Sequence, residues 1–89
     1  MKIDEIRQNI DQIDDEIVRL FQQRMALAGE VAREKQRTGA PVLDKNRENA
    51  ALARLEEQAD PAYHAALRAL YETIFRISRA HQAQLLKRE

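Results

Sequence analysis

Residues 4–37 read DEIRQNIDQIDDEIVRLFQQRMALAGEVAREKQR, and this stretch decides the fold. In it and just before it, apolar side chains recur at intervals of three and four residues, which is the period of one helical face. They fall at Ile3, Ile6, Ile10, Ile13, Ile17, Leu20, Leu27 and Val31. The spacing predicts a long amphipathic helix over about residues 4–37, ended by Gly39 in a left-handed cap and by Pro41.

Arg24 occupies the position that this apolar series skips. A side chain at that position faces the neighbouring helices, where an unpaired guanidinium is costly. Lys35 follows eleven residues later, about three helical turns, and therefore lies nearly on the same face. Two cations on this face indicate either a buried ion pair, with Glu48 or Glu30 as the partner of Arg24, or a pocket for an anion.

The length of the chain limits how much apolar surface one copy can bury. Its 89 residues make at most one domain, which we place at residues 1–89, with a modest core. A compact globule of this length is roughly 30 Å across, whereas a helix of about 34 residues is about 50 Å long. The first helix therefore extends beyond any monomer, and its N-terminal part is too apolar to be left in water. We expect a homodimer.

The composition excludes several classes of function. Fifteen basic and fifteen acidic residues cancel, so no bulk basic surface is available for nucleic acid. The chain has no cysteine for disulfides or thiolate chemistry, and two histidines are too few for a dedicated metal cage. Met1 favours a complete start, and neither a signal peptide nor a membrane span follows it. We expect a cytoplasmic protein without a metal.

Two further helices are predicted after the first. Asp44 has the chemistry of an N-cap for a helix from about Lys45 to Gln58. Asp60 and Pro61 combine a capping aspartate with proline at the first helical position, and they predict a third helix that runs to about Lys87. Since no segment has a strand pattern, the expected fold class is all-α, with a long first helix, a short second helix and a long third helix.

Polar residues also occupy places where the second and third helices should be apolar. Arg47 and Glu48 stand at the head of the second helix, and Ser78 and Gln82 lie one turn apart on the inner face of the third. Each has an ordinary explanation when taken singly, since a serine can bond back to a carbonyl one turn earlier and a terminal glutamine can be solvated. Together with the two cations of the first helix, they place polar groups from three helices at one level, as ligand sites in helical bundles do.

The types of these residues limit the chemistry of such a site. The sequence offers no Ser-His-Asp or Cys-His set, no glycine-rich phosphate loop and no pair of histidines at helical spacing. Fixed cations and neutral hydrogen-bond donors are what remain. Such groups suit the binding of a small polycarboxylate and the stabilisation of negative charge that develops on an oxygen.

The order of these residues resembles that of the all-helical chorismate mutases over essentially the whole chain. Residues 41–48, PVLDKNRE, look like the P-V-x-D-x-x-R-E signature of that family. The matched polar positions are Arg7, Arg24, Lys35, Asp44, Arg47, Glu48, Ser78 and Gln82. The resemblance implies an interlocked three-helix homodimer with two identical sites, and a rearrangement of chorismate to prephenate that needs no cofactor.

The resemblance also implies a role for each position. Arg24 would grip the substrate carboxylates with Arg7 of the partner subunit, because seventeen residues, about 25 Å of helix, separate Arg7 from Arg24 in one chain. Lys35 and Gln82 would hydrogen-bond the ether oxygen, where negative charge grows as the C–O bond breaks. Glu48 would hold the substrate hydroxyl. The other positions would complete the walls or pack on the ring: Asp44, Arg47, Ser78, Val31 and Phe75.

One position departs from the family pattern. Arg79 stands where family members generally have an apolar residue, so we expect its side chain to turn away, pair with an acid or alter the pocket. Two alternatives stay open beside the mutase. One is an isochorismate-pyruvate lyase of the same fold, which needs a similar cationic pocket, and the other is a non-catalytic regulatory helical dimer with its cations paired internally.

Overall fold

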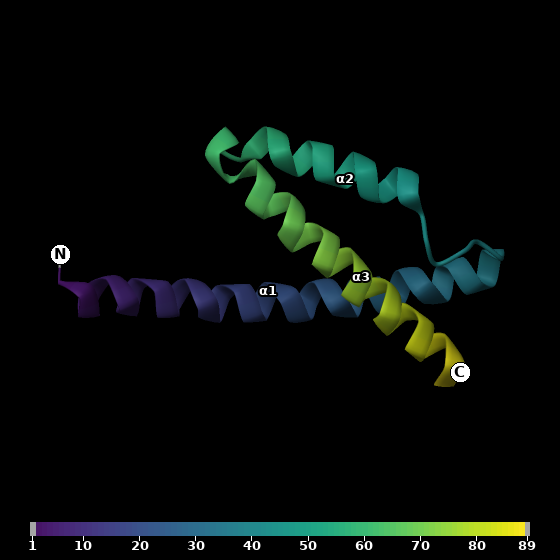
Figure 1. Cartoon of the computed structure of the whole chain (residues 1–89). Helices are drawn as coiled ribbons and strands as arrows, with labels where there is room; N and C mark the ends of the chain where they lie inside the picture. The colour runs from purple at the N-terminus through teal and green to yellow at the C-terminus, as the bar shows by residue number, and fades with distance from the viewer. Residues whose placement is uncertain (1, 89) are drawn as a thin grey trace.

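A computed structural model describes residues 2–88, and the described chain is helical throughout, without a strand. The elements are α1 (Ile3–Thr38), α2 (Lys45–Gln58), the short 3-10 helix η1 (Pro61–Tyr63) and α3 (His64–Arg88), shown in Figure 1. The all-α class and the sequence of long, short and long helices are therefore confirmed. The observed bounds of α2 agree with the predicted ones, and α1 is longer than predicted by one residue at each end.

Local hydrogen bonds explain where the first two helices end and begin. Gly39 closes α1 with a φ of 78°, the left-handed conformation that glycine adopts without steric cost, and its N–H donates to the carbonyl of Gln36. The carboxylate of Asp44 accepts a hydrogen bond of 3.0 Å from the backbone N–H of Arg47 and so caps α2. A short connection leads from the cap at the end of α1 to the cap at the start of α2 (Figure 1).

The third helix differs from the prediction in its first turn. The sequence predicted one α-helix from Pro61, but the structure has η1 over Pro61–Tyr63 and α3 only from His64. The reason lies in the cap: the carboxylate of Asp60 accepts from the N–H of Ala62 at 2.9 Å, and its carbonyl accepts from the N–H of Tyr63 at 2.9 Å. Bonds spanning two and three residues wind this turn more tightly than an α-helix.

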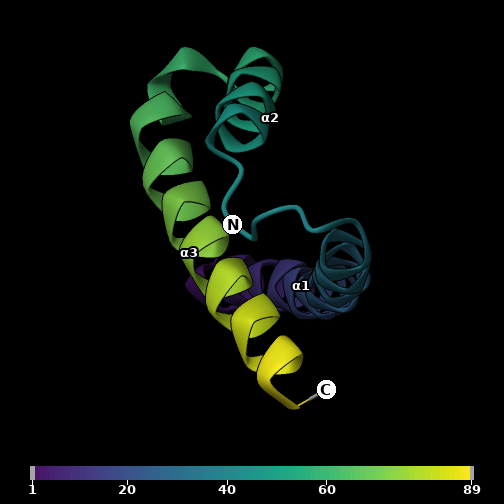
Figure 2. The ribbon, with the colours of Figure 1, turned by 90° about the vertical axis from the view of Figure 1, so that its right-hand side faces the viewer.

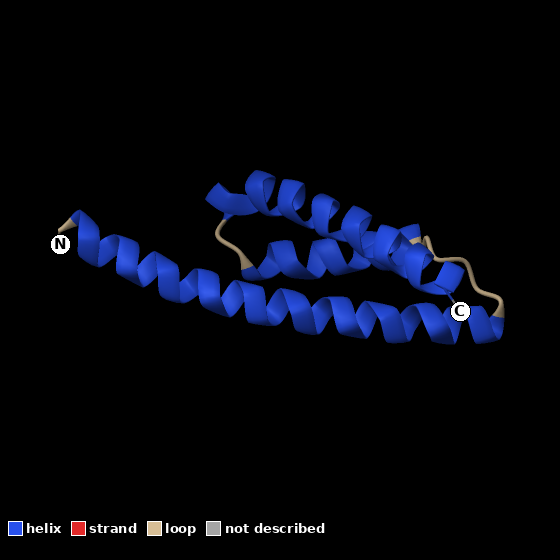
Figure 3. Ribbon diagram, turned by 90° about the horizontal axis from the view of Figure 1, so that it is seen from below, coloured by secondary structure: helices blue, strands red, loops and turns tan. Residues whose placement is uncertain are grey.

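The three helices leave half of α1 without a neighbour. α2 and α3 run antiparallel, and α3 crosses the C-terminal half of α1, whereas the N-terminal half extends alone (Figures 1 and 3). Figure 2 shows α2 separated from α1, with α3 joining the two. At the crossing stands Gly29, where a Cβ atom would lie only 2.9 Å from the Cδ1 atom of Leu85. The missing side chain therefore allows α3 to approach α1 closely.

The buried core of one chain is small. Its apolar members are Ala28, Ala32, Ala51, Leu52 and Phe75. No large side chain among the described residues is fully buried. The radius of gyration is 16.1 Å, against about 12 Å for a compact domain of this length. A single chain therefore has an open shape, 54 Å long and 15 Å thick.

The exposed half of α1 carries a continuous apolar surface, which we call the N-terminal stripe. Its members are Ile3, Ile6, Ile10, Ile13, Ile17 and Leu20, and they are 43% to 61% exposed. An apolar surface of this extent marks a site of association. In residues 2–88, no helix is both long and apolar enough to cross a membrane.

Candidate active site

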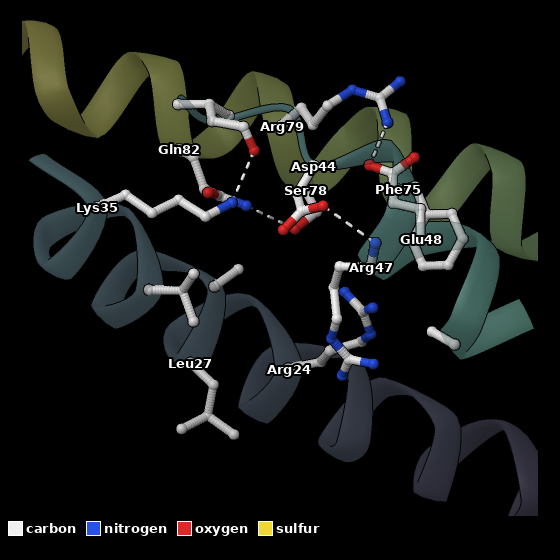
Figure 4. A pocket seen from close by; sticks show the side chains of 14 residues that line it. Arg24, Leu27, Lys35, Asp44, Arg47, Glu48, Phe75, Ser78, Arg79 and Gln82 are labelled. Atoms are coloured by element: carbon white, nitrogen blue, oxygen red, sulfur yellow. Dashed lines mark hydrogen bonds and ion pairs between the residues drawn. The ribbon is translucent and has the colours of Figure 1, made fainter. Parts of the chain in front are cut away.

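A pocket of about 300 Å³ lies between the C-terminal half of α1, the head of α2 and the middle of α3. Figure 4 shows its side chains converging from these elements and from the connection between α1 and α2. The lining residues are Arg24, Leu27, Ala28, Val31, Lys35, Val42, Asp44, Arg47, Glu48, Ala51, Phe75, Ser78, Arg79 and Gln82.

Arg24 is supported by two aromatic rings. Its Cζ atom lies 5.8 Å from the centroid of Phe75 and 6.0 Å from that of Tyr71, and the two rings meet edge to face at 62°. The negative faces of such rings attract a guanidinium without using its hydrogen-bond donors. Within residues 2–88 Arg24 forms no ion pair with a carboxylate. The alternative in which Glu48 or Glu30 neutralises Arg24 is therefore wrong for this structure.

Lys35 is held at the opposite end of the pocket from Arg24 (Figure 4). Its side chain is half-buried, and its Nζ atom donates a hydrogen bond of 2.8 Å to the carbonyl oxygen of Val42. This bond ties α1 to the connection that leads into α2. Because an ammonium group has three donors, the bond to Val42 orients Lys35 and leaves donors for a ligand.

Ser78 and Gln82 form a buried polar pair on the α3 wall. They are only 6% and 7% exposed, and the Nε2 atom of Gln82 donates to the Oγ atom of Ser78 at 3.3 Å. The Oε1 atom of Gln82 is buried without a hydrogen-bond partner in the described part of the chain. A buried amide oxygen without a hydrogen-bond partner costs free energy unless a bound ligand supplies the partner. If the amide group of Gln82 rotated by half a turn, its oxygen would accept a hydrogen bond from the hydroxyl of Ser78. Its N–H groups would then face a ligand in the pocket.

Glu48 pairs with Arg79 across two helices. The Nη1 atom of Arg79 on α3 donates to the Oε2 atom of Glu48 on α2 at 2.5 Å, and the side chains are 33% and 15% exposed. Of the three outcomes expected for Arg79, the structure shows the pairing with an acid. Both residues also line the pocket, so the pair belongs to its wall.

The charges that line the pocket favour an anion. Four cations, namely Arg24, Lys35, Arg47 and Arg79, outnumber two carboxylates, Asp44 and Glu48, so the net charge is +2. The carboxylate of Asp44 is engaged by the backbone of Arg47, and the guanidinium of Arg47 forms no ion pair within residues 2–88. Figure 4 shows the guanidinium groups of Arg24 and Arg47 on the same side of the pocket. Two like charges without acidic partners are suited to binding carboxylates.

The structure brings together nine of the ten site residues predicted from the sequence. The nine are Arg24, Val31, Lys35, Asp44, Arg47, Glu48, Phe75, Ser78 and Gln82. The tenth, Arg7, lies on the exposed half of α1, about 25 Å along the helix from Arg24. The roles of all ten residues stay predictions.

Four contributions to the pocket were missed in the sequence. Leu27 and Ala51 look like ordinary apolar helix positions, and Val42 contributes through a backbone carbonyl, which every residue has. Tyr71 lies outside the lining but supports Arg24. Its only signal was its spacing of four residues from Phe75, which places both rings on one face of α3. No cluster of three side chains suited to hold a metal occurs among the described residues.

Comparison with known proteins decides the family. The family model described as chorismate mutase type II matches residues 6–83, which include all three helices in large part and every predicted site residue. The chain belongs to the type II chorismate mutase family. The all-helical chorismate mutase resemblance predicted from the sequence is thus confirmed.

A curated chorismate mutase from Methanocaldococcus jannaschii is 45% identical to the chain over 47 residues. That alignment covers 53% of this chain and 48% of the relative, so the similarity to this chorismate mutase spans about half of the length of each. No solved structure matches the chain.

Proposed function

We propose that this protein is a chorismate mutase, which rearranges chorismate to prephenate in the shikimate pathway of aromatic amino-acid biosynthesis. The observation that carries the proposal is the cationic pocket, in which nine predicted site residues of a type II family chain meet. The family match over residues 6–83 also supports a single domain at residues 1–89. The cytoplasmic location and the independence from cofactors are parts of the same proposal.

Binding of the substrate would use the excess of positive charge. Chorismate carries two carboxylates, an ether oxygen and a ring hydroxyl, so it enters the pocket as a dianion opposite a net charge of +2. Arg24 is available to a carboxylate because the rings of Tyr71 and Phe75, rather than an acid, hold its guanidinium. A planar guanidinium binds a carboxylate with two parallel hydrogen bonds and so fixes its orientation. Arg47, Asp44 and Ser78 would form the surrounding walls.

Catalysis would come from position and electrostatics. The reaction breaks one C–O bond and forms one C–C bond within the same molecule, so no group leaves and no co-reactant is needed. Lys35 and Gln82 would donate hydrogen bonds to the ether oxygen, whose negative charge increases in the transition state. Val31 and Phe75 would pack on the ring and favour the compact conformer in which the two carbon atoms approach each other.

The N-terminal stripe supports a homodimer in which each site is shared. A second copy is the occupant that the stripe favours, because one chain is open, has a small core and leaves a helix half without neighbours. Arg7 lies on this same half of α1 and would be carried to the pocket of the other copy. It would add a further cation beside Arg24, in line with a substrate that has two carboxylates.

The dimer gives a first prediction. Sedimentation equilibrium at micromolar concentration should give about twice the chain mass of 10.3 kDa, because a second copy would cover the exposed apolar side chains of the stripe. Ile10→Glu, on the stripe, should weaken the dimer and lower the melting temperature together. Gln8→Glu, on the opposite face of α1, is the matched control and should change neither. A folded wild-type monomer of 10.3 kDa at this concentration would contradict the proposal.

The activity itself is tested by adding chorismate to the purified protein. The ultraviolet absorbance of chorismate should fall in proportion to enzyme concentration, with prephenate as the product. Release of pyruvate from isochorismate, without conversion of chorismate, would indicate the lyase instead. A folded dimer that acts on neither compound would support the non-catalytic alternative.

A further inference from the structure

The ion pair between Arg79 and Glu48 is the feature of the pocket that the proposed reaction leaves unexplained. It joins residues 31 positions apart in the sequence, through a contact of 2.5 Å between α3 and α2. Arg79 directly follows the buried Ser78 and stands three residues before Gln82. Its backbone therefore belongs to the α3 wall, beside Ser78 and within one turn of Gln82, which is proposed to hydrogen-bond the substrate.

The pair also separates two hollows of the surface. A second depression of about 180 Å³ lies between α2 and α3, and it shares Glu48, Phe75 and Arg79 with the pocket. Its remaining lining is formed by Lys45, Asn49, Leu52, Arg68 and Glu72. The ion pair and the ring of Phe75 thus make up the partition between the pocket and this depression. In Figure 4 the side chain of Arg79 extends away from Lys35 and reaches Glu48 at the edge of the site.

This placement fixes the carboxylate of Glu48. One oxygen, Oε2, is engaged by Arg79, and the other is left to accept a hydrogen bond from a ligand in the pocket. The pocket also holds Arg24 and Arg47, which have no acidic partner in residues 2–88 and would attract a mobile carboxylate. Arg79 therefore holds Glu48 at the partition and prevents its carboxylate from pairing with Arg24 or Arg47, the cations that would bind the substrate. A charge-assisted bond to a planar guanidinium is strong and directional enough for this task.

We propose that Arg79 is a positioning residue that makes the pocket selective for dianions that carry a hydroxyl group. Arg79 holds Glu48 in a position in which its free carboxylate oxygen accepts a hydrogen bond from the substrate hydroxyl. The inference rests on the proposed mutase function. It assigns to Arg79 an action through Glu48, without direct contact between Arg79 and the reacting atoms.

The test compares two substrates in four variants. The first substrate is chorismate, and the second is an analogue that keeps both carboxylates and the ether but lacks the ring hydroxyl. If the analogue turns over too slowly for kcat/KM to be measured, its inhibition constant is measured instead. The variants are Arg79→Met, Arg79→Lys, Glu48→Gln and the double variant Glu48→Gln with Arg79→Met. Arg68→Met is the matched control, because Arg68 also joins α3 to α2, through a contact of 2.6 Å with Glu56, but lies outside the pocket.

We expect a loss that depends on the hydroxyl. Arg79→Met should lower kcat/KM for chorismate at least about tenfold, and change that for the analogue less than about twofold. The double variant should be within about twofold of Glu48→Gln alone, since Arg79 acts through Glu48. Arg79→Lys, which keeps a cation that can pair with Glu48, should recover part of the loss, and Arg68→Met should leave both substrates unchanged. Arg79→Lys also keeps the comparison possible if Arg79→Met does not fold.

Several results would overturn the inference. An equal loss on both substrates would show a general electrostatic or structural effect, and additive losses in the double variant would show that Arg79 acts independently of Glu48. An unchanged kcat/KM for chorismate in Arg79→Met would show that Glu48 needs no support. Wild-type protein without mutase activity would overturn the proposed function as well, whereas an active wild type with any of the former results would overturn this inference alone.

Discussion

Lys35→Ala is expected to lower kcat at least about a hundredfold, which is the scale of losing one donor to a developing oxyanion. The ammonium of Lys35 is held in the pocket by its bond of 2.8 Å to the carbonyl of Val42. In the proposed reaction the ether oxygen gains negative charge as the C–O bond breaks, so a hydrogen bond from Lys35 would be stronger in the transition state than in the bound substrate. Its loss should therefore reduce kcat more than it raises KM.

Two further variants separate catalysis from folding in this experiment. Lys35→Met keeps the aliphatic packing of the side chain and removes only the charge, and it should lose as much activity as Lys35→Ala. Lys87→Ala changes an exposed lysine on α3 outside the pocket and should behave as wild type. Turnover near the wild-type rate in a folded Lys35→Ala dimer would remove Lys35 from the catalytic site.

Arg24→Ala is expected to lower kcat/KM by roughly 30- to 5,000-fold, because removing a buried charged contact costs about 2–5 kcal/mol. Arg24 has no acidic partner in the described chain, so in the proposed function its charge would be available to a substrate carboxylate. The same change should barely alter the stability of the free protein, since losing the contacts with Tyr71 and Phe75 is offset by removing a half-buried charge that has no acidic partner. Steady-state kinetics and thermal unfolding together measure both effects.

Arg37→Ala is the control for Arg24→Ala. Arg37 lies on the same helix and pairs with Glu34, but both side chains are exposed and outside the pocket. An exposed pair of this kind is screened by solvent and adds little to stability, so both folding and activity should be unchanged. If Arg24→Ala and Arg37→Ala lost equal activity, Arg24 would have no specific part in binding.

The helices could be predicted from the sequence because their signals are local. The spacing of the isoleucines sets the face of α1, Gly39 ends it, and Asp44 and Asp60 begin the next elements through bonds to nearby backbone groups. The tight first turn at Pro61 was missed because an aspartate cap followed by proline is compatible with both 3-10 and α geometry.

Most of the polar residues that line the pocket could be predicted because they interrupt apolar faces, but their pairing could not. Arg24 had two acids as candidate partners in the sequence, and the structure gives Glu48 to Arg79 and leaves Arg24 on the rings of Tyr71 and Phe75. Which cation reaches a given carboxylate depends on how α2 and α3 pack against each other, a tertiary property with no local signal. The sequence spacing shows on which face of its helix each residue lies. It does not show which residue of a neighbouring helix that side chain contacts.

The proposal that each site is shared between two chains is tested most directly by mixing two inactive variants. Arg7→Ala and Arg24→Ala homodimers should each be nearly inactive, since every site then lacks one arginine. After unfolding, mixing in equal amounts and refolding, about half of the dimers should be mixed, and each should contain one site with both lesions and one site with neither. The intact sites should return roughly a quarter of wild-type activity per total protein. If the mixture stays inactive although mass-tagged chains prove that subunits have exchanged, Arg7 and Arg24 do not meet across the dimer and the account is wrong.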